Sequence, residues 1–116
     1  MVIIGSKLDF KLYKNNIIKI EKNSIDYSKK NDRILFELDE DIFKIQIDDY
    51  QFEFEKENKD NIFKVSNDNA SLYLKEHDLL LPITVEDFYI HNEDNKYIIN
   101  YQLETDDEHT TIEIIL

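Results

Sequence analysis

The sequence IFKIQIDDYQFEFE, residues 42–55, decides the fold. Large apolar side chains alternate with polar ones on both sides of Asp48-Asp49, and such alternation is typical of strands that bury one face. A two-residue turn at Asp48-Asp49 is predicted to fold the segment into a hairpin whose large side chains all share one face. The expected cross-strand pairs are Ile47–Tyr50, Ile45–Phe52, Phe43–Phe54, Gln46–Gln51 and Lys44–Glu53.

The rest of the chain repeats this pattern. The sequence has one glycine, so its turns are assigned to clusters of Asn and Asp, which tolerate positive φ better than other residues. The clusters recur about every 8 to 15 residues, as in antiparallel sheets, and no window of ~10 residues shows a helical period. Further strands are expected at residues 7–13, 17–27, 33–38, 62–65, 71–74 and 79–90, and in a C-terminal pair within residues 97–116.

Two changes of parity predict β-bulges, one near Asn23-Ser24 and one near Glu86-Asp87. Pro82 cannot donate a backbone hydrogen bond, so it is expected where the long strand 79–90 extends past a neighbour. That strand also exceeds its expected neighbours, which suggests a homodimer formed through an open seam. The pairs expected in the C-terminal region are Ile90–Tyr97, Phe88–Ile99, Leu103–Ile112, Tyr101–Ile114 and Ile99–Leu116.

The hairpin at residues 42–55 needs other strands over it. Ordering its backbone costs more free energy than its apolar side chains gain on burial, so it is not stable alone. Closing several apolar-faced strands into a barrel covers the hairpin and removes exposed edges. The predicted fold is therefore all-β, with residues 1–116 forming a single antiparallel β-barrel of about 8–10 strands.

Three segments, residues 17–38, 42–55 and 96–116, resemble the strand pattern of the YwiB-like family. These are small bacterial proteins with a calycin-like, lipocalin-related barrel, and the resemblance implies a barrel of eight or so strands but no reaction. The chain departs from the family pattern at several positions. It has Ser24 where the family often has glycine, Glu53 to Glu55 where the family tends to carry Arg and Gly, and residues 75–78 in place of a Pro-Tyr-Gly-like turn.

Composition excludes several classes of function. A net charge of −12 and a single arginine argue against direct binding of nucleic acid, and they favour a basic partner. The absence of cysteine removes disulfides and thiolate metal sites. No apolar run reaches ~18 residues, so we expect a cytoplasmic protein that does not enter a membrane.

The aromatic side chains are the main candidates for a ligand site. In the expected registers they point inward, where they can fill the barrel or line a cavity for one apolar molecule. Both alternatives remain open from the sequence. The candidate ligand-binding residues are Phe36, Phe43, Phe52, Phe54, Phe88 and Tyr101.

The three histidines are candidate metal ligands. His77 and His109 are expected at the same end of the barrel with Asp107, whereas His91 is expected at the opposite end. Exposed loop histidines in an acidic chain are the alternative reading. No catalytic, phosphate-binding or calcium-binding motif is present, so no cofactor is expected.

Two functions follow as hypotheses. The first is a non-enzymatic binding module, with a small apolar molecule as its ligand. The second is an acidic inhibitor or immunity-type protein that covers a basic protein surface or mimics nucleic acid.

Overall fold

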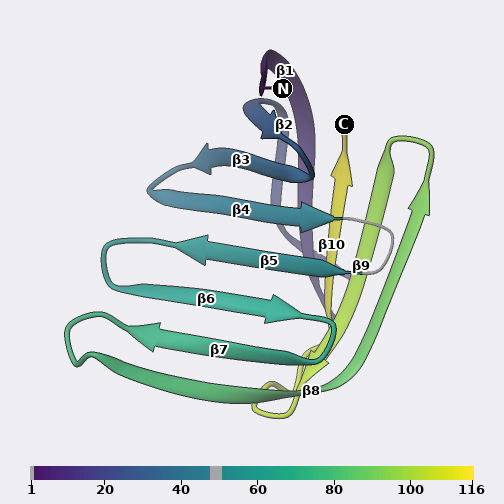
Figure 1. The fold of residues 1–116 in the computed structure, drawn as a ribbon. Helices are drawn as coiled ribbons and strands as arrows, with labels where there is room; N and C mark the ends of the chain where they lie inside the picture. Colours follow the sequence, from purple (N-terminus) through teal and green to yellow (C-terminus); the bar gives the residue numbers. More distant parts are fainter. Residues whose placement is uncertain (1, 48–50) are drawn as a thin grey trace.

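A computed structural model describes residues 2–47 and 51–116. In this part of the chain ten antiparallel strands follow one another, and no helix is present (Figure 1). The all-β prediction is therefore confirmed. The strands are β1 Val2–Lys14, β2 Ile17–Lys30, β3 Arg33–Leu38, β4 Asp41–Ile47, β5 Phe52–Glu57, β6 Asn61–Ser66, β7 Asn69–Leu74, β8 Leu79–Glu93, β9 Lys96–Leu103 and β10 Thr110–Ile115.

The strands form a closed barrel in which each strand pairs with its neighbours along the chain and β1 also pairs with β10. In Figure 1, β3 to β7 run across the molecule, whereas β1, β2, β9 and β10 run nearly at right angles to them. β8 joins the two halves, because its residues 79–84 pair with β7 and residues 85–93 pair with β9. The described strands thus form a closed ring, although the first residues of β8 extend past β9 without a partner on that side, and the homodimer suggested by the sequence stays a prediction.

Both predicted bulges are present. On β1 and β2, Leu8 pairs with Ile25 but Phe10 pairs with Lys22, so the extra residue lies at Asn23-Ser24. The second bulge lies between Val85 and Asp87 of β8, where the strand changes partner. Pro82 lies in the part of β8 that extends beyond the end of β9, as its missing N–H predicts.

The predicted registers of the hairpins are wrong, although the predicted faces are right. Ile45 pairs with Phe54 and Ile47 with Phe52, so the β4–β5 connection spans residues 48–51. The expected two-residue turn at Asp48-Asp49, and the Ile47–Tyr50 pair, fall on residues outside the described part. A longer connection moves the register by two residues, and an even shift leaves every side chain on its original face. The other pairs of this hairpin are Ile42–Glu57, Phe43–Lys56, Lys44–Glu55 and Gln46–Glu53.

The predicted C-terminal registers are also wrong by an even number of residues. Ile90 pairs with Ile99 instead of Tyr97, and the β9–β10 connection is longer than expected. These shifts are again even, so the interior set is unchanged. The observed pairs are Phe88–Tyr101, Tyr101–Thr110, Ile99–Ile112 and Tyr97–Ile114.

The turns use Asn and Asp at positive φ, as the near absence of glycine predicts. The described non-glycine residues at positive φ are Asn15, Asn16, Ser24, Asn31, Asp39, Asp78 and Asp94.

β1 and β2 run further than expected. β1 begins at Val2 and β2 continues to Lys30, because the two strands pair with each other beyond the bulge.

Candidate functional site

The six side chains predicted to line the interior all belong to the core. They come from β3, β4, β5, β8 and β9, and the alternation of each strand turns them to the same side. Phe36, Phe43, Phe52, Phe54 and Tyr101 are buried, and Phe88 is partly buried against them.

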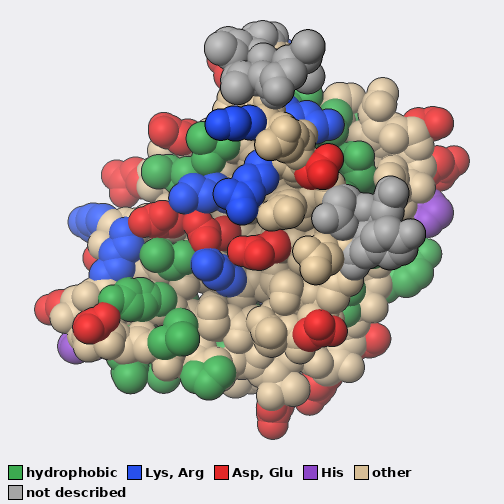
Figure 2. All heavy atoms as spheres, in the orientation of Figure 1, with side chains coloured by type: hydrophobic (Ala, Val, Ile, Leu, Met, Phe, Trp, Pro, Cys, Tyr) green, Lys and Arg blue, Asp and Glu red, His purple; other side chains and the backbone are tan. Residues whose placement is uncertain are grey.

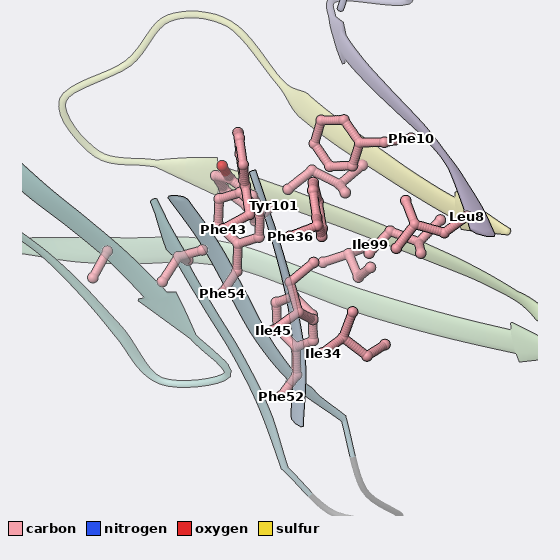
Figure 3. Close-up of a cluster of buried hydrophobic side chains, with 14 of the residues drawn as sticks. Leu8, Phe10, Ile34, Phe36, Phe43, Ile45, Phe52, Phe54, Ile99 and Tyr101 are labelled. Atoms are coloured by element: carbon pink, nitrogen blue, oxygen red, sulfur yellow. The ribbon is translucent and has the colours of Figure 1, made fainter. Parts of the chain in front are cut away.

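Phe43 lies at the centre of an aromatic cluster (Figure 3). Its ring centroid lies 5.0 Å from that of Phe36, 5.2 Å from Phe10 and 5.8 Å from Phe54. These are the separations of aromatic rings in direct contact. The protein's own side chains therefore fill this part of the interior.

Tyr101 is the one buried residue in the predicted set with a titratable group. Burial raises the pKa of its phenol far above the ordinary value, although its hydrogen bond with Thr110 acts in the opposite direction. Thr110 is itself buried and lies directly opposite Tyr101 across the β9–β10 ladder. The hydroxyl is thus neutral near pH 7 and serves to satisfy a buried polar pair.

A hollow of about 890 Å³ opens where β2 and β3 separate. β2 pairs with β3 only through residues 27–30, and its earlier residues pair with β1 alone. The hollow reaches one of the six predicted interior residues, Phe36, and its lining is mixed. It consists of Ile25, Tyr27, Leu35, Phe36 and Ile42 together with Asp26, Ser28, Glu37 and Lys44. Its volume is in the range of small-molecule sites.

One end of the barrel is strongly acidic. Because the strands alternate in direction, five connections lie along this rim of the barrel: residues 15–16, 39–40, 58–60, 75–78 and 104–109. In Figure 1 the connections between β3 and β8 on this rim lie at the left, and the β9–β10 connection lies at the bottom. We call these connections the acidic end. They carry nine carboxylates and two lysines, Lys59 and Lys75. The carboxylates are Asp39, Glu40, Asp60, Glu76, Asp78, Glu104, Asp106, Asp107 and Glu108.

His77 and His109 both lie at the acidic end, as predicted, and His91 lies toward the other end. Across the described residues, however, no group of three His, Asp or Glu side chains is close enough to hold a metal ion. The suggested set of His77, His109 and Asp107 is therefore not assembled. Loops that share one end of a barrel can still point their side chains apart, which sequence spacing does not reveal.

Asp106 fixes the β9–β10 connection. Its carboxylate accepts a hydrogen bond from Lys14 Nζ at 2.8 Å and another from the backbone N–H of Glu108 at 2.9 Å. Lys14 Nζ also donates to Thr110 Oγ1 at 2.7 Å. The bonds from Lys14 and Glu108 hold the pKa of Asp106 below its usual range, so the carboxylate is charged.

The same connection is tied to the β1–β2 turn. Asn15 and His109 exchange two hydrogen bonds of 2.9 Å, one between backbones and one from His109 N to Asn15 Oδ1. With Asp106 engaged inside the loop, Asp107 and Glu108 remain exposed on its outer side. The loop thus presents its charge from a fixed backbone.

The β7–β8 turn is anchored in a similar way. Lys75 Nζ donates to Glu57 Oε2 at 2.8 Å, and Lys75 N donates to Asp60 O at 3.0 Å. The bond from Lys75 is the main reason that the pKa of Glu57 is lowered. Tyr73 donates its hydroxyl to Asp78, which raises the pKa of the phenol.

Exposed aliphatic residues follow two of the connections at the acidic end. Ile17 and Ile18 follow the β1–β2 turn and are 62% and 49% exposed, and Leu79 to Leu81 follow the β7–β8 turn. Leu80 is 60% exposed. Figure 2 shows apolar side chains gathered at the lower left, where β7 and the start of β8 lie. These five residues make up most of the exposed large apolar side chains in the described part of the chain.

Sequence reasoning missed this surface. Leu79 and Leu81 share the parity of the core residues, so alternation alone assigns them to the interior. They are exposed because this part of β8 extends beyond β9, and only the position of Pro82 hinted at that overhang.

Comparisons with protein-family models, with curated proteins and with solved structures find no match. Within the described residues, no helix is long and apolar enough to cross a membrane. The site must therefore be interpreted from its own geometry.

Proposed function

We propose that this protein is a non-enzymatic binding protein whose acidic end docks on a basic surface of another protein. This is the inhibitor or immunity-type role that the net charge suggests. The observation that carries the proposal is the excess of carboxylates over lysines in the connections of the acidic end, together with the exposed aliphatic side chains that follow two of these connections.

The two kinds of side chain would serve different steps of binding. Clustered carboxylates attract a cationic surface over about one Debye length and speed association, whereas they add less to final affinity. The aliphatic groups supply apolar area, which slows dissociation once it is buried. Most soluble monomers do not gather large apolar side chains beside a charged loop without a binding role.

Anchoring of the loops favours affinity. Lys14, Asp106 and Thr110 hold the β9–β10 connection, and the Asn15–His109 bonds join it to the next turn. A surface that is already ordered loses little conformational entropy on binding. We expect the cytoplasm as the site of action, because the cysteine-free fold requires no disulfides.

Matched charge variants test the proposal. Asp107→Asn with Glu108→Gln removes two charges at the acidic end, and Glu93→Gln with Asp94→Asn removes two at the β8–β9 turn. Proteins from the source cell should be retained at low salt by the wild-type and the β8–β9 variant, and lost from the acidic-end variant. Leu80→Ser should reduce the retention that survives at high salt. Equal retention by the two charge variants would refute docking through this end.

A small apolar ligand is the second candidate, and the hollow between β2 and β3 is the observation that favours it. The hollow gives access to Tyr27 and to the edge of the aromatic set at Phe36. The chain has no tryptophan, so Tyr27→Trp would place a single fluorescent reporter at the hollow. Saturable changes in its emission with an apolar probe, absent from Tyr89→Trp, would support this role. A flat titration would remove it.

A further inference from the structure

A second surface stands apart from the acidic end, on the outside of β2 to β6. A groove of about 520 Å³ runs across these strands, a volume typical of sites for small molecules. We call it the outer groove. Figure 2 shows Lys and Arg side chains gathered on this face, above a group of Asp and Glu side chains.

Four cations line the outer groove, and they differ in their surroundings. Lys44 and Lys64 both lie beside Glu55, with N–O separations of 3.5 Å and 3.4 Å. Lys30 and Arg33 form no ion pair with any carboxylate of the described residues. In a chain with an excess of Asp and Glu, two neighbouring cations without such a partner are unexpected.

The strand register holds these two cations together. Lys30 lies directly opposite Arg33 on β2 and β3, so their Cβ atoms are about 5 Å apart. Like charges at opposite positions destabilise a sheet. A nearby anion would relieve this repulsion, and a guanidinium beside an ammonium can hold a carboxylate with several charge-assisted hydrogen bonds.

The rest of the groove limits the kind of anion. Leu35, two residues along β3 from Arg33 and therefore roughly 7 Å away, lies in the groove and is 43% exposed. On the other side, Arg33 pairs with Gln46 and Gln46 with Glu53, which places a carboxylate about two strand spacings, ~10 Å, from the guanidinium. An extended polyanion crossing the groove would meet Glu53.

We propose that the outer groove binds a small organic monocarboxylate, with its carboxylate on Arg33 and Lys30 and its apolar body over Leu35. Arg33 supplies the paired N–H donors and Lys30 a second cation. Glu53 disfavours ligands that carry a second negative charge toward β5. This site is independent of the acidic end, and the two would bind different partners.

The test is an NMR titration of the ¹⁵N-labelled protein with hexanoate, and with acetate, hexylamine and hexyl phosphate as the comparison probes. Hexanoate should give saturable shifts confined to β2 to β5. Acetate should bind more weakly because it lacks an apolar body, and hexylamine should not bind there. Tighter binding of hexyl phosphate than of hexanoate would overturn the carboxylate assignment, as would the absence of saturable shifts with hexanoate.

Variants separate a specific site from general charge. Arg33→Gln and Lys30→Gln should each raise the Kd for hexanoate roughly ten- to a hundredfold, the effect of losing a charge-assisted hydrogen bond. Lys19→Gln is the matched control, because Lys19 is an exposed cation near the other end of β2. Equal weakening by Lys30→Gln and Lys19→Gln would refute the site.

Stability gives a second readout. If Lys30 and Arg33 repel each other, Lys30→Gln should not lower the urea midpoint of the free protein. A clear fall in that midpoint would show that Lys30 has a structural role, and it would contradict the proposal even if binding were reduced.

Discussion

Replacing Phe43 by alanine tests whether the barrel interior is filled. Phe43 is buried at the centre of three ring contacts, with Phe10, Phe36 and Phe54. Phe→Ala substitutions in cores cost about 3–5 kcal/mol, and aromatic pairs contribute about 0.5–1.5 kcal/mol each beyond burial. With three such pairs, we expect Phe43→Ala to lower the free energy of unfolding by about 4–5 kcal/mol.

The expected loss is large compared with the whole stability of a domain, which is about 5–15 kcal/mol. At ~4 °C per kcal/mol for a chain of this length, Tm should fall by about 15–20 °C. Urea unfolding followed by circular dichroism measures the change, and an unaltered slope would show that the unfolding reaction is the same. Phe43→Leu should cost less, because it leaves a smaller cavity.

Tyr89→Ala is the control, because Tyr89 is an aromatic residue that is 57% exposed. Its effect should stay within about 0.5 kcal/mol. If Phe43→Ala cost less than about 1 kcal/mol, the rings would not be supporting one another, and a hollow barrel would be the better description. A packed interior also predicts that the variant, but not the wild-type, acquires affinity for a benzene-sized molecule.

Three further substitutions test other features. Asp106→Asn should lower the free energy of unfolding at pH 7 by about 1–2 kcal/mol. Because folding lowers the pKa of Asp106, this difference should shrink progressively as the pH falls below ~4, and an undiminished difference at pH 2 in urea titrations would contradict the assignment. Because folding raises the pKa of Tyr101, the stability that its neutral phenol provides is complete below pH ~10 and is lost at higher pH. The free energy of unfolding of Tyr101→Phe should therefore fall less than that of the wild-type between pH 10 and 12, whereas Tyr89→Phe should follow the wild-type. Ser24 has φ 58°, so Ser24→Gly should stabilise the protein by about 0.5 kcal/mol in urea unfolding. Ser28→Gly, within the paired part of β2, should destabilise it. A change in the free energy of unfolding of the same sign for both variants would refute strain at the bulge.

Alternation in the sequence predicts which side chains face inward, and it does so even where the register is wrong. Phe52 and Phe54 are buried as expected, although each pairs with a residue two positions from the expected one. The face on which a side chain lies depends on whether its position along the strand is odd or even, and the sequence shows this directly. Register depends on the length of each connection, and Asn and Asp clusters mark a turn without fixing how many residues it uses.

The two predicted bulges could be found because a change of parity is itself a sequence signal, whereas the register shifts between Ile3 and Ser6 and between Leu12 and Tyr13 were not predicted. At Ser24 the chain places serine at a positive φ, where glycine would be relaxed. The resemblance to the YwiB-like family and to a calycin-like barrel stays a prediction.

The surface sites were not predictable in the same way. Lys30 and Arg33 are opposite each other only because β2 continues to Lys30, and Leu80 is exposed only because β8 extends past β9. Both facts depend on the residue at which each strand ends, which the alternation of apolar and polar residues does not fix. A single sequence carries that information only indirectly, through the positions of Pro82 and of the turns.

The pairing of β1 with β10 has a consequence for synthesis. Asp9 is joined to Ile115 and Lys14 to Thr110, so the ring cannot close until the residues up to Ile115 have left the ribosome. Until then β1 has a partner on one side only, and its free backbone groups can capture a strand of another nascent chain. Refolding of the purified chain at low concentration should therefore give less aggregate than folding during translation at high expression.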